Sequence, residues 1–141
     1  MKLLISITIL MSLVGCSRWF VITAEQKENK TYFSSEDVLD ECNNLPIYVV
    51  SVTVSRKDCA NDCVYWEVVD DQLDTEIKPT DFPFVYGEPV PGRTTRVEAK
   101  DLLPGQYHIS GSMGCEGFLP YVNGDFGVDV SNGAIKLINL E

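Results

Sequence analysis

The sequence has little of what most catalytic sites and nucleic-acid interfaces need. It contains a single histidine, His108, and only 11 Lys and Arg against 21 Asp and Glu, which gives a net charge of −10. No residue near His108 in the sequence could orient it as a general base, so we expect a solvated surface side chain. The shortage of positive charge argues against nucleic acid as a partner, because phosphate groups are repelled.

Several motifs with known chemistry are also missing. The sequence contains no Gly-x-Ser-x-Gly, no phosphate-binding glycine loop and no cluster of histidines. Four carboxylates between residues 70 and 76 lack the glycine and the spacing of an EF-hand loop, so we expect them to be solvated. The sequence therefore predicts a protein that is not an enzyme and that uses no metal and no cofactor.

The chain has no apolar run of the roughly 20 residues that a membrane-spanning helix needs. Residues 3–14 are mostly apolar, follow Lys2 and precede the small residue Gly15, a pattern typical of a signal peptide. The tetrapeptide Leu13-Val14-Gly15-Cys16 resembles the lipobox of bacterial lipoproteins. An ordinary signal peptide with an incidental cysteine is the alternative.

The resemblance implies cleavage before Cys16 and attachment of diacylglycerol to its thiol. The chain then divides into a signal peptide (1–15), a lipid anchor with an N-terminal segment (16–33) and one folded domain (34–141). Ser17 stands where the family's inner-membrane retention signal has Asp. Several acyl chains such as palmitate hold a protein firmly, so we expect the outer membrane, with the domain facing the periplasm or the cell surface.

Four cysteines remain after Cys16, and an even number in an exported protein predicts two disulfides. Three pairings are possible. We favour Cys59–Cys63 across the tip of a turn and Cys42–Cys115 over a long separation. Zinc would need a second close pair or a nearby histidine, and a redox pair is usually Cys-x-x-Cys, one residue shorter than the spacing found here.

Alternating apolar residues predict strands at 47–55, 63–69 and 94–99. In the first, four side chains are expected on one face: Tyr48, Val50, Val52 and Val54. In the second, Val64, Trp66 and Val68 are expected inward. Residues 19–22 could form a first strand and 25–30 a polar connector. Ser34 or Ser35 would cap one short helix ending near Cys42. Four prolines between 79 and 92 predict a loop or an edge strand.

The last hairpin is expected to turn at Asn132-Gly133, the preferred pair for a type I′ turn. Antiparallel strands about that turn would oppose three pairs of residues, namely Val130 with Ile135, Val128 with Leu137, and Asp129 with Lys136. Apolar and charge pairing both agree with the turn chemistry, which fixes the register.

Residues 94–111, with the phrase Leu103-Pro104-Gly105-x-Tyr107, and Gly117-Phe118 shortly after, resemble the end of transthyretin-like and carboxypeptidase-regulatory-like modules. The resemblance implies a small antiparallel β-sandwich, transthyretin-like or Ig-like. We therefore expect an all-β fold with one short helix and two disulfides. Tyr107 could bury its ring and return its hydroxyl to the backbone, as in a tyrosine corner.

Two loops concentrate aromatic residues between prolines and glycines, and we take them as the candidate partner-binding surface: Phe82, Phe84 and Tyr86, with Phe118 and Tyr121. The alternative is that they close the ends of the core.

The expected function is a non-enzymatic binding or scaffold module for a partner protein of the cell envelope. The alternative is an inhibitor or ligand-capture lipoprotein, lysozyme-inhibitor-like, with a cationic target. Ser110-Gly111 is not followed by the tyrosine of the Ser-Gly-x-x-Tyr motif of membrane-bound lysozyme inhibitors.

Overall fold

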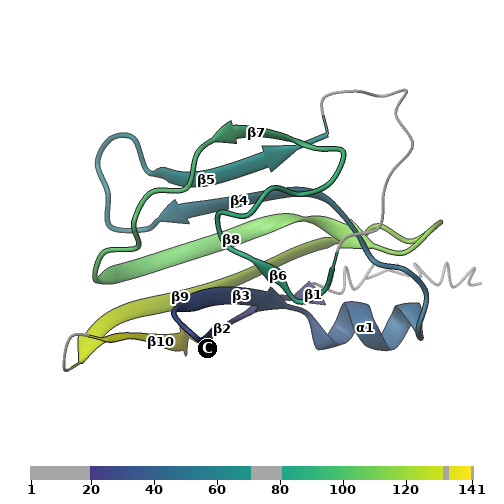
Figure 1. The fold of residues 1–141 in the computed structure, drawn as a ribbon, viewed down its shortest axis with the longest axis horizontal. Coiled ribbons are helices and arrows are strands. Elements are labelled where there is room, and N and C mark those ends of the chain that lie inside the picture. Colours follow the sequence, from purple (N-terminus) through teal and green to yellow (C-terminus); the bar gives the residue numbers. More distant parts are fainter. Residues whose placement is uncertain (1–19, 71–80, 132–133, 141) are drawn as a thin grey trace, which may run out of the picture.

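The chain forms two β-sheets packed face to face, with one short helix (Figure 1). The computed structural model describes residues 20–70, 81–131 and 134–140. All strand pairs are antiparallel except the pair of β1 with β9. The predicted all-β fold with one short helix and two disulfides is confirmed.

The larger sheet has seven strands and the smaller has three. The larger sheet is ordered β1 (Phe20–Val21), β9 (Tyr121–Ser131), β8 (Gly105–Gly114), β4 (Tyr48–Arg56), β5 (Val64–Val69) and β7 (Thr94–Val97), with β10 (Ala134–Leu140) also paired to β9. The smaller sheet is ordered β2 (Thr23–Lys27), β3 (Lys30–Ser34) and β6 (Phe84–Val85). The short edge strand β6 agrees with the prolines around it.

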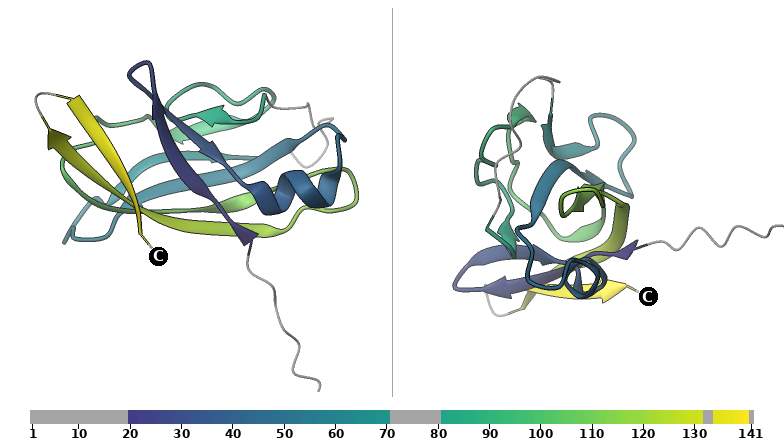
Figure 2. Two further views of the ribbon diagram at one scale, coloured as in Figure 1. Left: turned by 90° about the horizontal axis from the view of Figure 1, so that it is seen from below. Right: turned by 90° about the vertical axis from the view of Figure 1, so that its right-hand side faces the viewer.

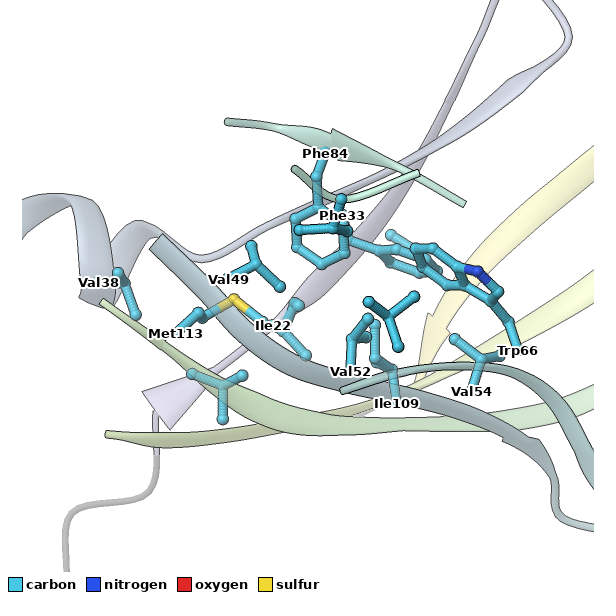
Figure 3. Close-up of a cluster of buried hydrophobic side chains, with 14 of the residues drawn as sticks. Ile22, Phe33, Val38, Val49, Val52, Val54, Trp66, Phe84, Ile109 and Met113 are labelled. Carbon is cyan, nitrogen blue, oxygen red and sulfur yellow. The ribbon is translucent and has the colours of Figure 1, made fainter. Parts of the chain in front are cut away.

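The core lies between the two sheets and is rich in aromatic rings (Figure 3). Phe33 of the smaller sheet is at its centre, with ring centroids 5.6 Å from Phe84 and 5.6 Å from Phe126. Trp66 is fully buried beside Val68, as the alternation in that strand predicts. The opposite face of the larger sheet carries the polar residues of the same strands.

A β-bulge in β4 changes which residues face the core. Its pairing with β8 shifts between Val49 and Ser51, which leaves Val50 as an extra residue. Val49 is buried before the bulge, and Val52 and Val54 are buried after it. The prediction that Tyr48 and Val50 face the core with Val52 is therefore wrong for those two, because an added residue exchanges the faces of a strand.

The predicted polar connector at 25–30 is instead part of a hairpin between β2 and β3. Glu28 and Asn29 have φ values of 49° and 64°, the positive values that a type I′ turn needs at both central positions. Only Ala24 of β2 is buried, so the strand carries almost no apolar alternation. That lack of alternation explains why residues 25–30 do not look like a strand in the sequence.

The helix α1 (Glu36–Cys42) begins at the predicted serine. Ser35 is its N-cap and accepts a hydrogen bond from the backbone N–H of Val38, while Ser34 ends β3. The buried disulfide Cys42–Cys115 joins the last residue of the helix to the end of β8. The second disulfide is Cys59–Cys63, so the favoured pairing is confirmed.

The register predicted for the last hairpin is confirmed. Three pairs lie opposite each other in β9 and β10 as expected: Val130 with Ile135, Val128 with Leu137, and Asp129 with Lys136. The turn residues Asn132 and Gly133 lie outside the described residues. The predicted strand at 94–99 is shorter than expected, because β7 ends at Val97.

Candidate functional site

The first aromatic loop belongs mostly to the core. Phe84 is 4% exposed, because β6 directs its side chain toward Phe33. Phe82 packs against Phe84, with ring centroids 5.9 Å apart. The hydroxyl of half-buried Tyr86 donates to the backbone oxygen of Lys100 at 2.7 Å. Phe84 is therefore packed in the core, which favours the alternative that this loop closes an end of the core.

The second aromatic loop is divided between the core and the surface. Phe118 is partly buried and meets Phe20 edge to face at 5.5 Å. Tyr121, the first residue of β9, is 77% exposed. The buried neighbour Val122 points to the core, so Tyr121 points to the outer face of the larger sheet. The structure thus does not bring Tyr121 together with Phe82, Phe84 and Tyr86.

Exposed apolar side chains gather instead at one end of the molecule. The described part of the chain exposes six large hydrophobic residues, and Leu103, before the start of β8, is the one at the opposite end. The other five lie on β1, on α1, in the segment after α1, in the β8–β9 connection and at the start of β9 (Figure 1). We call these five the end surface: Val21, Leu39, Leu45, Leu119 and Tyr121. Figure 2 (right) looks onto this end.

Covalent and hydrogen bonds link the segments that carry the end surface. The backbone N–H of Val21 donates to Asp37 Oδ2 of α1 at 3.1 Å. Leu45 follows Cys42, whose disulfide to Cys115 joins the helix to the β8–β9 connection. Ser112 Oγ donates to the backbone oxygen of Leu119 at 3.0 Å. These bonds tie the segments that carry the end surface to one another.

Acidic side chains surround the end surface. Glu36, Asp40 and Glu41 of α1 are exposed, and so is Glu116 in the β8–β9 connection. The last turn of α1 carries no basic residue. Part of the protein's net charge of −10 is thus concentrated beside the exposed leucines.

The outer face of the larger sheet forms a shallow groove over β4, β8 and β9. Its lining is almost entirely uncharged: Ser51, Thr53, His108, Ser110, Gly111, Tyr121, Val122 and Asn123. Tyr121 thus lies where the groove meets the end surface.

His108 has the oriented partner that the sequence does not reveal. Its Nδ1 atom lies 2.6 Å from Asp125 Oδ1 on β9, and Lys57 Nζ lies 3.0 Å from Asp125 Oδ2. Two hydrogen bonds lower the pKa of Asp125 below its ordinary value; the bond with His108 has the larger effect and the bond with Lys57 the smaller. The two residues are 17 positions apart, and only the pairing of β8 with β9 brings them together.

This pair does not form a nucleophilic triad within the described residues, since no hydroxyl there is hydrogen-bonded to the His108 ring. Nor do three or more His, Cys, Asp or Glu side chains gather around a possible metal position in that part of the chain. Three of the candidate calcium carboxylates, Asp71, Asp74 and Glu76, lie outside the described residues. The absence of enzymatic activity stays a prediction.

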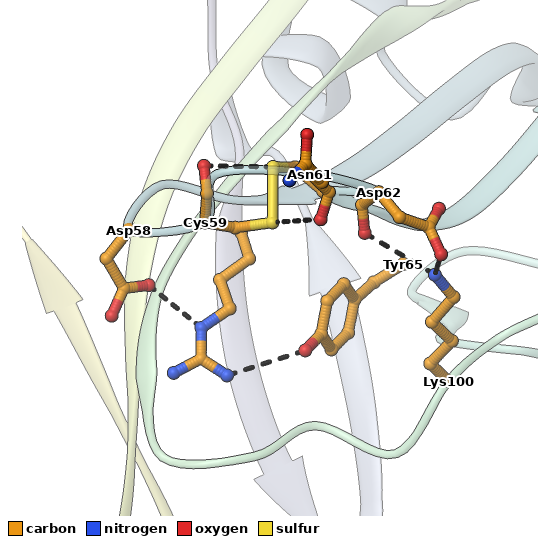
Figure 4. The surroundings of a disulfide bond; sticks show 8 residues. Asp58, Cys59, Asn61, Asp62, Tyr65 and Lys100 are labelled. Carbon is orange, nitrogen blue, oxygen red and sulfur yellow. Dashed lines mark hydrogen bonds and ion pairs between the residues drawn. A yellow bond between two sulfur atoms is a disulfide. The ribbon is translucent and has the colours of Figure 1, made fainter.

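The Cys59–Cys63 loop lies beside Lys57 at the other end of the sheet and is held by ion pairs (Figure 4). Arg56 Nε donates to Asp58 Oδ1 at 2.9 Å, and this bond lowers the pKa of Asp58. Lys100 Nζ lies 2.8 Å from Asp62 Oδ2. These contacts give the disulfide loop a structural role.

No known protein family, curated protein sequence or solved structure matches this chain. No helix among the described residues has the length and apolar character needed to cross a membrane.

Proposed function

We propose that this protein is a lipoprotein of the bacterial cell envelope and a non-enzymatic binding module that docks a partner protein through its end surface. The observation that carries the proposal is the gathering of five of the six exposed large hydrophobic side chains at one end. Single exposed apolar residues need no explanation, whereas a group rimmed by polar residues is typical of an interaction site.

The bonds that cross-link the end surface favour binding. Leu39 and Leu45 flank the buried Cys42, and Leu119 lies in the connection held by Cys115. Because a preformed surface loses little conformational entropy when a partner docks, most of the buried apolar area can contribute to affinity. Tyr121 adds a rigid ring with a polar tip, a residue type enriched in interfaces.

The resemblance of residues 13–16 to a lipobox supports a position of this surface close to a membrane. Cys16 precedes Phe20 by four residues, and four residues span at most ~14 Å when fully extended. Phe20 begins β1, the strand that carries Val21. A lipid on Cys16 would therefore hold the end surface next to the bilayer, so the partner must reach the membrane surface. With Ser17 after Cys16, the outer membrane is the proposed location.

The exposed carboxylates at the same end favour a second candidate, capture or inhibition of a cationic target. Glu36, Asp40 and Glu116 would steer a positively charged protein toward the exposed leucines. Salt separates the two candidates, because steering between exposed charges weakens as ionic strength rises whereas apolar burial does not. Binding that is lost at high salt supports the cationic target.

The test compares two charge insertions in the full-length, lipidated protein. Leu45→Asp with Leu119→Asp places charge in the end surface. Leu103→Asp places charge at the opposite end, on a leucine whose exposure is similar to that of Leu45. Proteins captured from detergent-solubilised envelopes are compared by quantitative mass spectrometry. We expect a specific partner to be lost from the end-surface variant and kept by the Leu103→Asp control. Identical capture by both variants would contradict the proposal.

A further inference from the structure

We propose that the groove on the outer face of the larger sheet binds a neutral saccharide. This binding site adjoins the end surface, but the inference does not rest on partner docking there. The two sites share Tyr121 at their border, so the experiment below uses groove residues that lie away from that border.

Three neighbouring strands supply the groove with rows of short polar side chains. In one row Thr53, Ser110 and Asn123 are register partners across β4, β8 and β9. In the next row Ser112 is the partner of both Ser51 and Tyr121. Adjacent strands are about 4.8 Å apart and rows about 7 Å apart, so the groups cover an area that suits a short oligosaccharide.

The hydrogen-bonding capacity of this face is largely unused. Ser51, Thr53, Ser110 and Asn123 are all half-buried, and their side chains form no hydrogen bond with another described residue. Half-buried polar groups are satisfied by water or by a ligand. A side-chain hydroxyl or amide can both donate and accept hydrogen bonds, and so can a sugar hydroxyl. The groove side chains can therefore form hydrogen bonds with a saccharide in either direction.

The charged groups beside the groove favour a neutral ligand over an ionic one. Asp125, at one end, is already shared between His108 and Lys57, which leaves neither a free carboxylate nor a free ammonium group there. Glu67 on β5 is the register partner of Thr53 and does not line the groove. An anionic ligand would be disfavoured in the groove because Lys57 is already paired with Asp125. A cationic ligand would interact more strongly with the acidic side chains of α1.

Tyr121 supplies the apolar contact that a sugar ring needs. Its exposed ring lies at the opposite end of the groove from Asp125. A pyranose presents a face of C–H bonds that packs on an aromatic ring, while its hydroxyls point to the sides, toward the polar rows. A peptide strand fits less well, because its backbone groups pair at the edge of a sheet and not on its face.

The test uses saturation-transfer NMR with the full-length lipidated protein in nanodiscs. The probes are cellohexaose, maltohexaose and the hexamer of N-acetylglucosamine. We expect transfer to at least one probe, and a loss of affinity of about tenfold in the double variant Thr53→Val with Ser110→Ala, which removes two hydroxyls. The end-surface variant Leu45→Asp is the matched control and should bind the saccharide as the parent does.

Three results would overturn the proposal. The first is an absence of transfer to all three probes. The second is unchanged affinity in the Thr53→Val, Ser110→Ala variant, whose circular dichroism spectrum must match the parent. The third is preference for the deacetylated, cationic glucosamine hexamer that disappears when salt is added, since that would assign binding to the acidic surface. Partner docking by the end surface can succeed or fail independently of each result.

Discussion

The hydroxyl of Tyr107 donates a hydrogen bond to the backbone oxygen of Leu103 at 2.6 Å. The ring is fully buried and stacks on Phe126, with centroids 5.3 Å apart. Burial raises the pKa of Tyr107 to about 12, so the hydroxyl keeps its proton and donates throughout the physiological range. This bond ties the turn at Pro104-Gly105 to the strand that follows it, as the sequence predicts for a tyrosine corner.

Replacing Tyr107 with phenylalanine should therefore destabilise the domain while leaving the core packed. The ring is kept, but the carbonyl of Leu103 loses its partner, which costs about 1–2 kcal/mol. Urea denaturation followed by tryptophan fluorescence measures the change. Tyr121→Phe serves as the control, because that hydroxyl is exposed. Equal losses in the two variants would show that the Tyr107 hydroxyl has no special role.

The two disulfides should contribute unequally to stability. The residues of Cys42–Cys115 are separated by 73 positions and those of Cys59–Cys63 by 4. On the chain-entropy account the long loop contributes about 4 kcal/mol and the short one about 2 kcal/mol. Each pair is replaced by serines and unfolded in urea. A larger loss from removing Cys59–Cys63 would contradict the loop-length argument.

The sequence-based interpretation places Phe84 and Tyr121 on one aromatic surface. Truncation of Phe84 should nevertheless lower the free energy of unfolding far more than truncation of Tyr121. Phe84→Ala removes a buried ring and should cost about 3–5 kcal/mol. Tyr121→Ala removes an exposed one and should change stability by about 0.5 kcal/mol or less. Chemical denaturation of both variants decides the matter. A mild effect of Phe84→Ala would return that residue to the candidate surface.

The stability of the domain should depend on Asp125 in acid. Because its pKa is lowered in the folded state, the contribution of Asp125 is complete above the ordinary carboxyl pKa and is lost as the pH falls through the lowered value. Asp125→Asn should therefore flatten the fall in unfolding free energy below about pH 5. Glu116→Gln, which removes the same charge from an exposed turn, should keep the slope of the parent. A parental slope in Asp125→Asn would refute the assignment.

Lipidation at Cys16 can be checked directly in cells. Cys16→Ser removes the thiol that the lipobox resemblance assigns to the acyl chains. We expect the parent to incorporate labelled palmitate and to fractionate with membranes, and the variant to do neither. Normal labelling of Cys16→Ser would end the lipoprotein proposal, while the fold and the groove would be unaffected.

Local chemistry explains the parts of the fold that the sequence alone predicts. Ser35 caps α1 because a serine oxygen accepts the free N–H of the first turn. The β9–β10 register follows from the fit of residues close together in the chain. The pairing Cys42–Cys115 is a weaker case, since the sequence allows three pairings and the structure confirms the favoured one.

Long-range register decided the rest, and no short segment encodes it. The bulge at Val50 exchanges the faces of β4 only because β8 lies beside it. Phe84 is buried because it lies on the side of β6 that faces the core, whereas Tyr121 is exposed because it lies on the outer side of β9. The aromatic composition of the two segments does not distinguish these positions. His108 and Asp125 come together because the antiparallel register of β8 and β9 makes them partners. The β8–β9 connection between them does not reveal that register in the sequence. The end surface and the groove arise in the same way, since each collects residues from segments that are separated in the sequence and lie side by side only in the folded chain.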